Sequence, residues 1–208
     1  MAETFLIYNT ILVLSVACAI GVKACSGWRE WLMRGLLFVV MTVPAVLRYQ
    51  IGTDYASYES IYNSSNLLFA DIEPGYAGLN YIFYHLDAPV EWLFALMAVL
   101  TYAPIAFGVR QKYIVPVVLF YILTAYLPSY SIIRQSLVVS WLMVALLRYL
   151  DDEHIGRLYL TIVAASFIHL SALVVLPFVL FRRIHLSEWV VLLLLPVAFY
   201  VARHGFID

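Results

Sequence analysis

Seven long apolar runs, separated by short polar segments, constrain this chain more than any other feature of its sequence. Each run approaches the ~20 apolar residues that a helix needs to cross a bilayer, although the second and fourth are short. The runs are continuous rather than alternating, which favours helices over a closed barrel. We therefore predict an all-α integral membrane protein, a polytopic bundle of about seven transmembrane helices. The runs cover roughly residues 5–22, 31–47, 90–109, 113–127, 132–150, 158–181 and 186–202.

Composition supports the membrane class and excludes several others. Of the 208 residues, 64% are apolar and 12% are charged, whereas a soluble domain carries about 25% charged residues. This excludes a disordered tail, a coiled coil and a water-soluble domain. The net charge of −1 leaves no basic surface for nucleic acid. Cys18 and Cys25 suggest neither a disulfide nor a metal site. No internal repeat divides the chain, so we expect a single membrane domain over 1–208.

The distribution of lysine and arginine predicts the orientation. No Lys or Arg precedes the first apolar run, and Lys23 and Arg29 follow it, which is the reverse of a secretory signal. We expect an N-terminus outside, a C-terminus inside and a long outer loop at 48–89, with Arg34 snorkelling from the inner end of the second run. This topology places eight basic residues inside and four outside, in agreement with the positive-inside rule. The eight are Lys23, Arg29, Arg34, Arg110, Lys112, Arg148, Arg157 and Arg203, and the four are Arg48, Arg134, Arg182 and Arg183.

Polar residues that are costly in lipid mark candidate sites, and the first group lies in the outer loop. Arg48 ends the second run, and Gly52 permits a turn after which Asp54 can cap a short helix. Four residues then recur at helical spacing on one face: Tyr55, Tyr58, Glu59 and Tyr62. We expect an ordered outer element over 48–62. The alternative is an aromatic belt at the interface with a capping aspartate.

Three further segments each contribute one ionisable residue. Glu73 precedes Pro-Gly, for which ordinary turn chemistry is the alternative, and the segment 76–86 after it is too short to cross the bilayer. Arg134 stands near the start of the fifth run, where snorkelling is the alternative to function. His169 lies at mid-length of the sixth run and is predicted to share a helix face with Ser166. Its alternative is a packed structural histidine.

Four short pieces occur in a fixed order, and together they resemble a known family. They are Arg48-x-x-Ile51-Gly52-Thr53-Asp54-Tyr55-x-x-Tyr58, Glu73-Pro74, Ile133-Arg134-Gln135 and Phe167-Ile168-His169-Leu170-Ser171-Ala172-Leu173. Over about residues 30–180 the chain resembles the EpsG family of bacterial polysaccharide polymerases, the Wzy-like O-antigen polymerase group. Members are usually longer, so the resemblance implies a short or truncated one. It also implies a bacterial inner-membrane enzyme of the glycosyltransferase type. Such an enzyme joins repeat units linked to undecaprenyl pyrophosphate at the periplasmic face, for lipopolysaccharide O-antigen, capsule or exopolysaccharide.

The candidate residues fit the chemistry that the resemblance implies. Breaking an anomeric C–O bond to a polyprenyl pyrophosphate releases a highly charged group, so fixed cations are needed at its phosphates. We expect these to be Arg48 and Arg134. The attacking hydroxyl needs a base or acceptor, for which the candidates are Asp54, Glu73 and His169. Flat faces for sugar rings are offered by Tyr55, Tyr58 and Tyr81.

The donor is already activated by its lipid, so we expect neither a cofactor nor a metal. The expected partners are the lipid-linked oligosaccharide and the bilayer, with a chain-length regulator or flippase as a further candidate and no nucleic acid. Two alternatives remain open. In the first, a transporter of lipid-linked oligosaccharide or another anionic solute would use the arginines to bind its substrate without chemistry. In the second, the chain is a truncated, non-catalytic membrane subunit.

Overall fold

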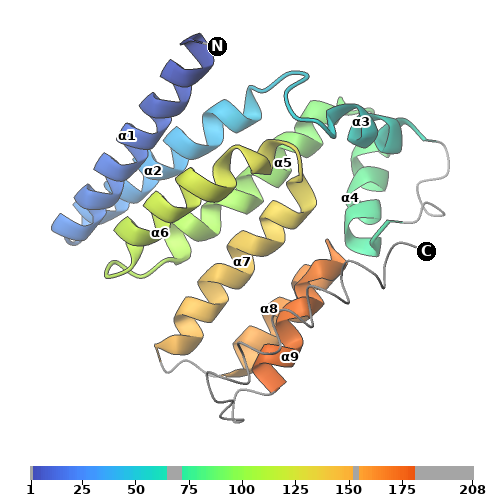
Figure 1. The fold of residues 1–208 in the computed structure, drawn as a ribbon. Coiled ribbons are helices and arrows are strands. Elements are labelled where there is room, and N and C mark those ends of the chain that lie inside the picture. Colours follow the sequence, from blue (N-terminus) through green and yellow to red (C-terminus); the bar gives the residue numbers. More distant parts are fainter. Residues whose placement is uncertain (1, 65–71, 152–154, 181–208) are drawn as a thin grey trace, which may run out of the picture. The chain divides into compact units, whose positions relative to one another are not determined.

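The computed structural model describes residues 2–64, 72–151 and 155–180, and every regular element in these ranges is helical (Figure 1). The prediction of an all-α protein is therefore confirmed for this part of the chain. The α-helices are α1 (Ala2–Ala24), α2 (Trp28–Val46), α3 (Tyr55–Asn63), α4 (Pro74–His85), α5 (Val90–Ala103), α6 (Ile114–Tyr121), α7 (Ile133–Leu150), α8 (Ile155–Ser166) and α9 (Val175–Leu180). Tighter or wider turns form η1 (Pro104–Gly108), η2 (Ile122–Tyr126), η3 (Pro128–Tyr130) and η4 (Leu170–Val174).

Three helical segments of the described residues are long and apolar enough to cross a membrane. They are Phe5–Ala24, Val90–Gly108 and Ile133–Leu150, and they correspond to the first, third and fifth predicted spans. The helices at the fourth and sixth runs are shorter, at Ile114–Tyr126 and Ile155–Ser166. The run at 186–202 lies outside the described residues. The structure thus supports a membrane protein with three such spans, and the count of seven is not confirmed.

The chain divides into two compact units, residues 1–173 and 174–208. In the first unit consecutive helices run back and forth, so that α1 packs on α2 and α6, α2 on α5, α5 on α7, and α7 on α8 (Figure 1). One end of this bundle therefore carries the turns near residues 48–54 and 128–132. The other end carries the turns near residues 25–27 and 109–113. The described part of the second unit is the end of η4 and α9.

Two apolar clusters hold the first unit together. The larger lies among α1, α2, α5 and α6 and includes Leu37, Met41 and Ile105, none of which is exposed. The smaller joins α3 and α4 to the first turns of α5 and α7, and three tyrosines of α3 enter it: Tyr55, Tyr58 and Tyr62. The helix predicted from their spacing is confirmed, and Glu59 lies exposed.

The sixth run is not the continuous helix that its hydropathy predicts. The helix α8 ends at Ser166, and a turn at 167–169 leads into the 3₁₀ segment η4. His169 therefore lies in a break between helices, and the expected shared face with Ser166 is wrong. The reason is that backbone groups of the turn bond outside their own helix: the carbonyl of Phe167 accepts from Gly75 N–H at 2.8 Å, and Leu170 N–H donates to Glu73 Oε1 at 3.1 Å.

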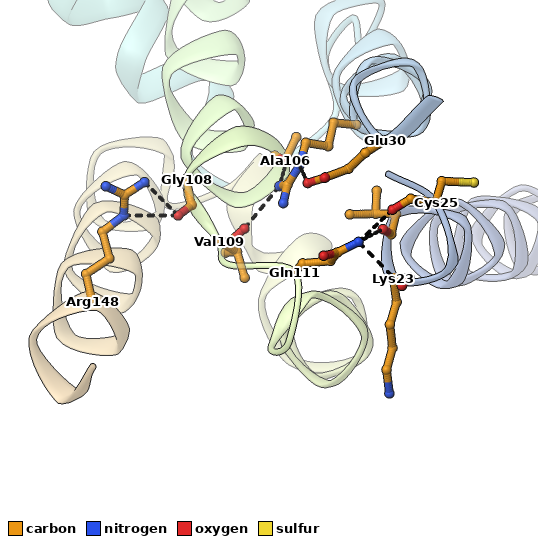
Figure 2. Close-up of polar contacts among 10 residues, drawn as sticks. Lys23, Cys25, Glu30, Ala106, Gly108, Val109, Gln111 and Arg148 are labelled. Atoms are coloured by element: carbon orange, nitrogen blue, oxygen red, sulfur yellow. Dashed lines mark hydrogen bonds and ion pairs between the residues drawn. The ribbon is translucent and has the colours of Figure 1, made fainter. Parts of the chain in front are cut away.

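At the end of the bundle that carries residues 109–113, polar side chains donate to backbone carbonyls (Figure 2). Arg34 is only 5% exposed and donates to the carbonyls of Ala106 and Val109 at 2.7 and 3.0 Å, while Glu30 pairs with it at 2.9 Å. The snorkelling predicted for Arg34 is therefore wrong. The last carbonyls of a helix lack N–H donors within the helix. Arg34 supplies the missing donors at the end of the π turn η1.

Candidate functional site

The side chain of Glu73 joins three of the predicted site residues. Its Oε1 lies 2.5 Å from Nδ1 of His169, and its Oε2 pairs with Nη1 of Arg134. Glu73 stands at the N-terminal cap of α4, Arg134 in the first turn of α7, and His169 in the turn after α8. Arg134 and His169 follow Glu73 by 61 and 96 positions in the sequence, yet the three side chains are in contact. We call Glu73, Arg134 and His169 the Glu73 cluster.

Local sequence explains why the turn after α8 lies against α4. Pro74 occupies the first helical position, where its missing N–H costs nothing. A Cβ atom on Gly75 would lie 2.6 Å from the carbonyl oxygen of Phe167, so only glycine allows this approach. The close backbone contact brings residues 167–170 within reach of the Glu73 carboxylate.

The protonation states in the Glu73 cluster follow from its hydrogen bonds. Burial acts to raise the pKa of Glu73, but hydrogen bonds from backbone N–H groups and from His169, with the charge of Arg134, outweigh it and hold the pKa below its usual range. The carboxylate is therefore ionised at neutral pH and can only accept hydrogen bonds. It follows that Nδ1 of His169 carries a proton and donates its hydrogen bond to Glu73, so that Nε2 is the ring nitrogen not bonded to this carboxylate.

Arg134 contacts two aromatic rings as well as pairing with Glu73. Its guanidinium lies 5.7 Å from the ring centroid of Tyr58 and 5.3 Å from that of Tyr76. Its side chain is 20% exposed. Among the described residues, Nε of Arg134 and the hydroxyl of Tyr76 are buried without a hydrogen-bond partner. The cluster therefore keeps polar groups that its own side chains do not satisfy.

Arg48 lies near Tyr55 and Tyr58 of α3, and its side chain is buried. It is 6% exposed, donates from Nη1 to the carbonyl of Tyr130 at 2.5 Å, and lies 5.2 and 5.5 Å from the ring centroids of Phe94 and Tyr130. Burial lowers the pKa of Arg48, opposed by the nearby tyrosines. Its Nε, like that of Arg134, is buried without a partner among the described residues.

The loop after Arg48 is fixed against the turn at Pro128–Ser131. Gly52 has φ +115°, and a Cβ there would lie 2.3 Å from the carbonyl oxygen of Tyr130, so the position requires glycine. The backbone N–H of Thr53 donates to Oγ of Ser131 at 3.1 Å. The predicted ordered element over 48–62 is therefore present, and it holds Arg48 at the same end of the bundle as Arg134.

The remaining predicted site residues do not join the Glu73 cluster. Asp54 caps α3 by position only, since its side chain accepts from Thr53 Oγ1 at 3.1 Å and makes no bond to the helix backbone. Tyr55 and Tyr58 are 6% and 7% exposed, so both rings are buried within the smaller apolar cluster. Tyr81 is 40% exposed on α4, with its ring centroid 3.9 Å from that of His85. Of the three tyrosines predicted to bind sugar, only Tyr81 presents an accessible ring.

Several residues that build the site carry no distinctive signal in the sequence. Tyr76 and Phe94 flank the two arginines, yet each reads in sequence as one more aromatic residue of an apolar segment. Gly75 could have been noticed through the Glu-Pro-Gly run, but its partner Phe167 lies far along the chain. In the ranges that the structure describes, no group of three or more His, Cys, Asp or Glu residues is arranged to hold a metal ion.

Comparison with known proteins agrees with the resemblance in the motifs. The family model described as the EpsG family matches residues 31–207, which include Arg48, the Glu73 cluster and nearly all the helices. No curated protein and no solved structure matches the chain. The family match indicates a function of the polysaccharide-polymerase type in a membrane. Because it covers well over half of the sequence, the chain belongs to the EpsG family.

Proposed function

We propose that this protein polymerises polyprenyl-pyrophosphate-linked repeat units at the periplasmic face of a bacterial inner membrane, with the Glu73 cluster as its reaction centre. The observation that carries the proposal is the bridge from Glu73 to both Arg134 and His169. It combines a fixed cation with an oriented imidazole, which are the two groups that such a transfer needs. Family membership supports the reaction class.

In the proposed step, a sugar hydroxyl of one repeat unit attacks the anomeric carbon of another. A new glycosidic C–O bond forms, the C–O bond to the pyrophosphate breaks, and the hydroxyl proton passes to Nε2 of His169. Glu73 is a positioning residue in this scheme, because its carboxylate fixes the tautomer and orientation of the ring and stabilises the imidazolium that forms. The polyprenyl pyrophosphate leaves with the bonding electron pair.

The two arginines have different parts in this proposal. Arg134 is 20% exposed, so its guanidinium is suited to bind a phosphate oxygen directly. Arg48 is more deeply held, and its positive charge acts on the same region from behind the α3 tyrosines. Tyr81 on α4 is the aromatic face proposed for a sugar ring, since it is exposed.

The orientation in the proposal is supported by the placement of basic residues in the first unit. The alternation of helices sets seven of them at the end of the bundle away from the Glu73 cluster: Lys23, Arg29, Arg34, Arg110, Lys112, Arg148 and Arg157. Of the basic residues that the structure describes, only Arg48 and Arg134 lie at the same end as Glu73. Under the positive-inside rule, the Glu73 end faces the periplasm.

The test is a polymer-length gel of surface polysaccharide from a strain that lacks the gene and carries a variant copy. His169→Gln should abolish the ladder and leave single repeat units, with unchanged protein in the membrane by immunoblot. The control is His154→Gln, which makes the same change at a histidine that lies between α7 and α8 in the sequence and is not one of the proposed site residues. A normal ladder from His169→Gln would overturn the proposal, and loss of all surface glycan in the strain without the gene would indicate export instead.

A further inference from the structure

A cavity of about 260 Å³ lies in the first unit between the end of α5, α7 and α8. It lies at the bundle end away from Glu73, and the proposed polymerase site does not use it. Its walls are mostly apolar and include Pro104, Trp141, Ala145 and Leu158. Two arginines also line it, Arg148 near the end of α7 and Arg157 near the start of α8.

Arg148 is held in place by the backbone rather than by a carboxylate. Its Nε and Nη2 both donate to the carbonyl oxygen of Gly108, at 3.1 and 3.0 Å (Figure 2). The described carboxylate nearest in sequence, Asp151, pairs instead with Arg110 at 2.9 Å and with Lys112. Within the described ranges no carboxylate neutralises Arg148, although a half-buried charge normally has a counter-ion.

We propose that this cavity binds one anionic phospholipid, with its phosphate at Arg148 and Arg157 and the start of an acyl chain along Trp141 and Ala145. A guanidinium fork matches phosphate oxygens, and Nη1 of Arg148 remains for this contact. The apolar walls suit a hydrocarbon chain. A free inorganic anion would leave these walls uncovered, so a phospholipid fits the cavity better. The cavity volume is close to the lower end of the range for small-ligand pockets, ~300–1,000 Å³. The cavity therefore holds only part of the lipid, and the remainder of its acyl chains extends into the bilayer.

The position along the helices agrees with this occupant. Arg148 and Arg157 lie where α7 ends and α8 begins, which is the headgroup level of a membrane that α7 crosses. Basic pockets between transmembrane helices at the cytoplasmic side bind acidic headgroups. The choice of the cytoplasmic leaflet rests on the orientation proposed above, whereas the lipid site itself does not depend on the polymerase reaction.

The first experiment measures lipid retention by native mass spectrometry of the purified full chain in detergent. Dioleoyl phosphatidylglycerol should bind about tenfold more tightly than dioleoyl phosphatidylcholine, because both carry the phosphate but the choline cation neutralises the headgroup of the second lipid near the two arginines. Arg148→Ala should remove this preference. Ala145→Phe should weaken binding of the anionic lipid by filling the apolar wall while leaving Arg148 and its bond to Gly108 in place. Lys23→Gln removes one exposed charge at the same bundle end and should change nothing.

Thermal unfolding of each variant is measured as well, and lipid binding is compared only among variants that remain folded. This is needed because Arg148→Ala also leaves the Gly108 carbonyl without the two donors of Arg148. Should Arg148→Ala fail to fold, Ala145→Phe decides the matter alone. Equal binding of the two lipids by the native chain, or undiminished phosphatidylglycerol binding by folded Ala145→Phe protein, would overturn the proposal.

A second experiment identifies what fills the cavity in the membrane. A benzophenone amino acid replaces Thr161, which lines the cavity, and the protein is irradiated in vesicles that contain phosphatidylglycerol. The expected product is the chain plus the mass of one phospholipid. A crosslink to residues 181–208 of the same chain, or to a second copy, would show another occupant and contradict the proposal.

Discussion

Replacing Glu73 by glutamine tests the Glu73 cluster most sharply, since it removes a charge while keeping the size of the side chain. The carboxylate accepts three hydrogen bonds, from His169 Nδ1, Leu170 N–H and Arg134 Nη1. A glutamine has one carbonyl oxygen and one NH₂ group. Whichever way its amide turns, the NH₂ faces a donor, either Arg134 on one side or the His169 and Leu170 pair on the other.

The size of the effect follows from the bonds that are lost. A hydrogen bond to a charged group contributes about 1.5–3 kcal/mol, and the three side chains are partly open to solvent, with 9% exposure at Glu73, 20% at Arg134 and 27% at His169. We expect a loss of about 2 kcal/mol in the free energy of unfolding, with solvent screening included. Loss of an oriented general base costs about 10²–10⁴-fold in rate, so the polymer ladder should disappear.

The assay combines a polysaccharide gel, an immunoblot of the membrane fraction and thermal unfolding of the purified protein. Glu73→Gln should give single repeat units only, with protein still detectable in the membrane. The matched control is Glu59→Gln, which makes the same change at an exposed position of α3 and should leave the ladder intact. A ladder of normal length from Glu73→Gln protein at its normal level would refute the assignment of Glu73 as a positioning residue.

Four further predictions follow from contacts described above. Gly75→Ala should abolish the ladder by pushing α4 from the 167–170 turn, whereas Gly78→Ala on the same helix meets nothing and should be tolerated or stabilise by about 1 kcal/mol; ladders and thermal unfolding of both variants check this. Arg134→Lys keeps a charge but loses the planar guanidinium fork, so the ladder should shorten at an unchanged protein level on the immunoblot. Arg34→Met leaves two carbonyls without donors and should lower the free energy of unfolding by about 2–4 kcal/mol in denaturant titration. Because the folded-state pKa of Glu73 is lowered, its stabilising effect is present above about pH 4.3, the usual glutamate pKa, and is lost as pH falls further; acid titration should therefore destabilise the native protein more than Glu73→Gln.

The sequence predicts those features of this protein that depend on local patterns. Hydropathy locates the segments that become α1, α5 and α7, and the spacing of three tyrosines predicts α3 and its buried face. The conformation at Gly52 also follows from a local requirement, since its φ is positive. Periodicity and turn chemistry are properties of neighbouring residues, so one sequence is enough to read them.

The predictions that failed depend on contacts between distant segments. The break after Ser166 is invisible to hydropathy, because Phe167 and Ile168 are apolar and the groups that stabilise the turn, Gly75 and Glu73, lie some 90 residues earlier. Arg34 was expected to reach outward because its carbonyl partners near η1 are more than 70 residues away. The candidate residues could be named one by one from the sequence. That Arg134 and His169 both contact Glu73 could not be predicted from it.

The separation of the Glu73 cluster along the chain sets the order in which it is assembled during synthesis. At about 5–20 residues per second, Arg134 emerges roughly 3–12 s after Glu73, and His169 roughly 5–19 s after it. Arg134 is therefore available to the Glu73 carboxylate before His169 has been synthesised. A ribosome that stalls between these two events leaves Glu73 and Arg134 without His169, so the Glu73 cluster is complete only once the turn after α8 has been made.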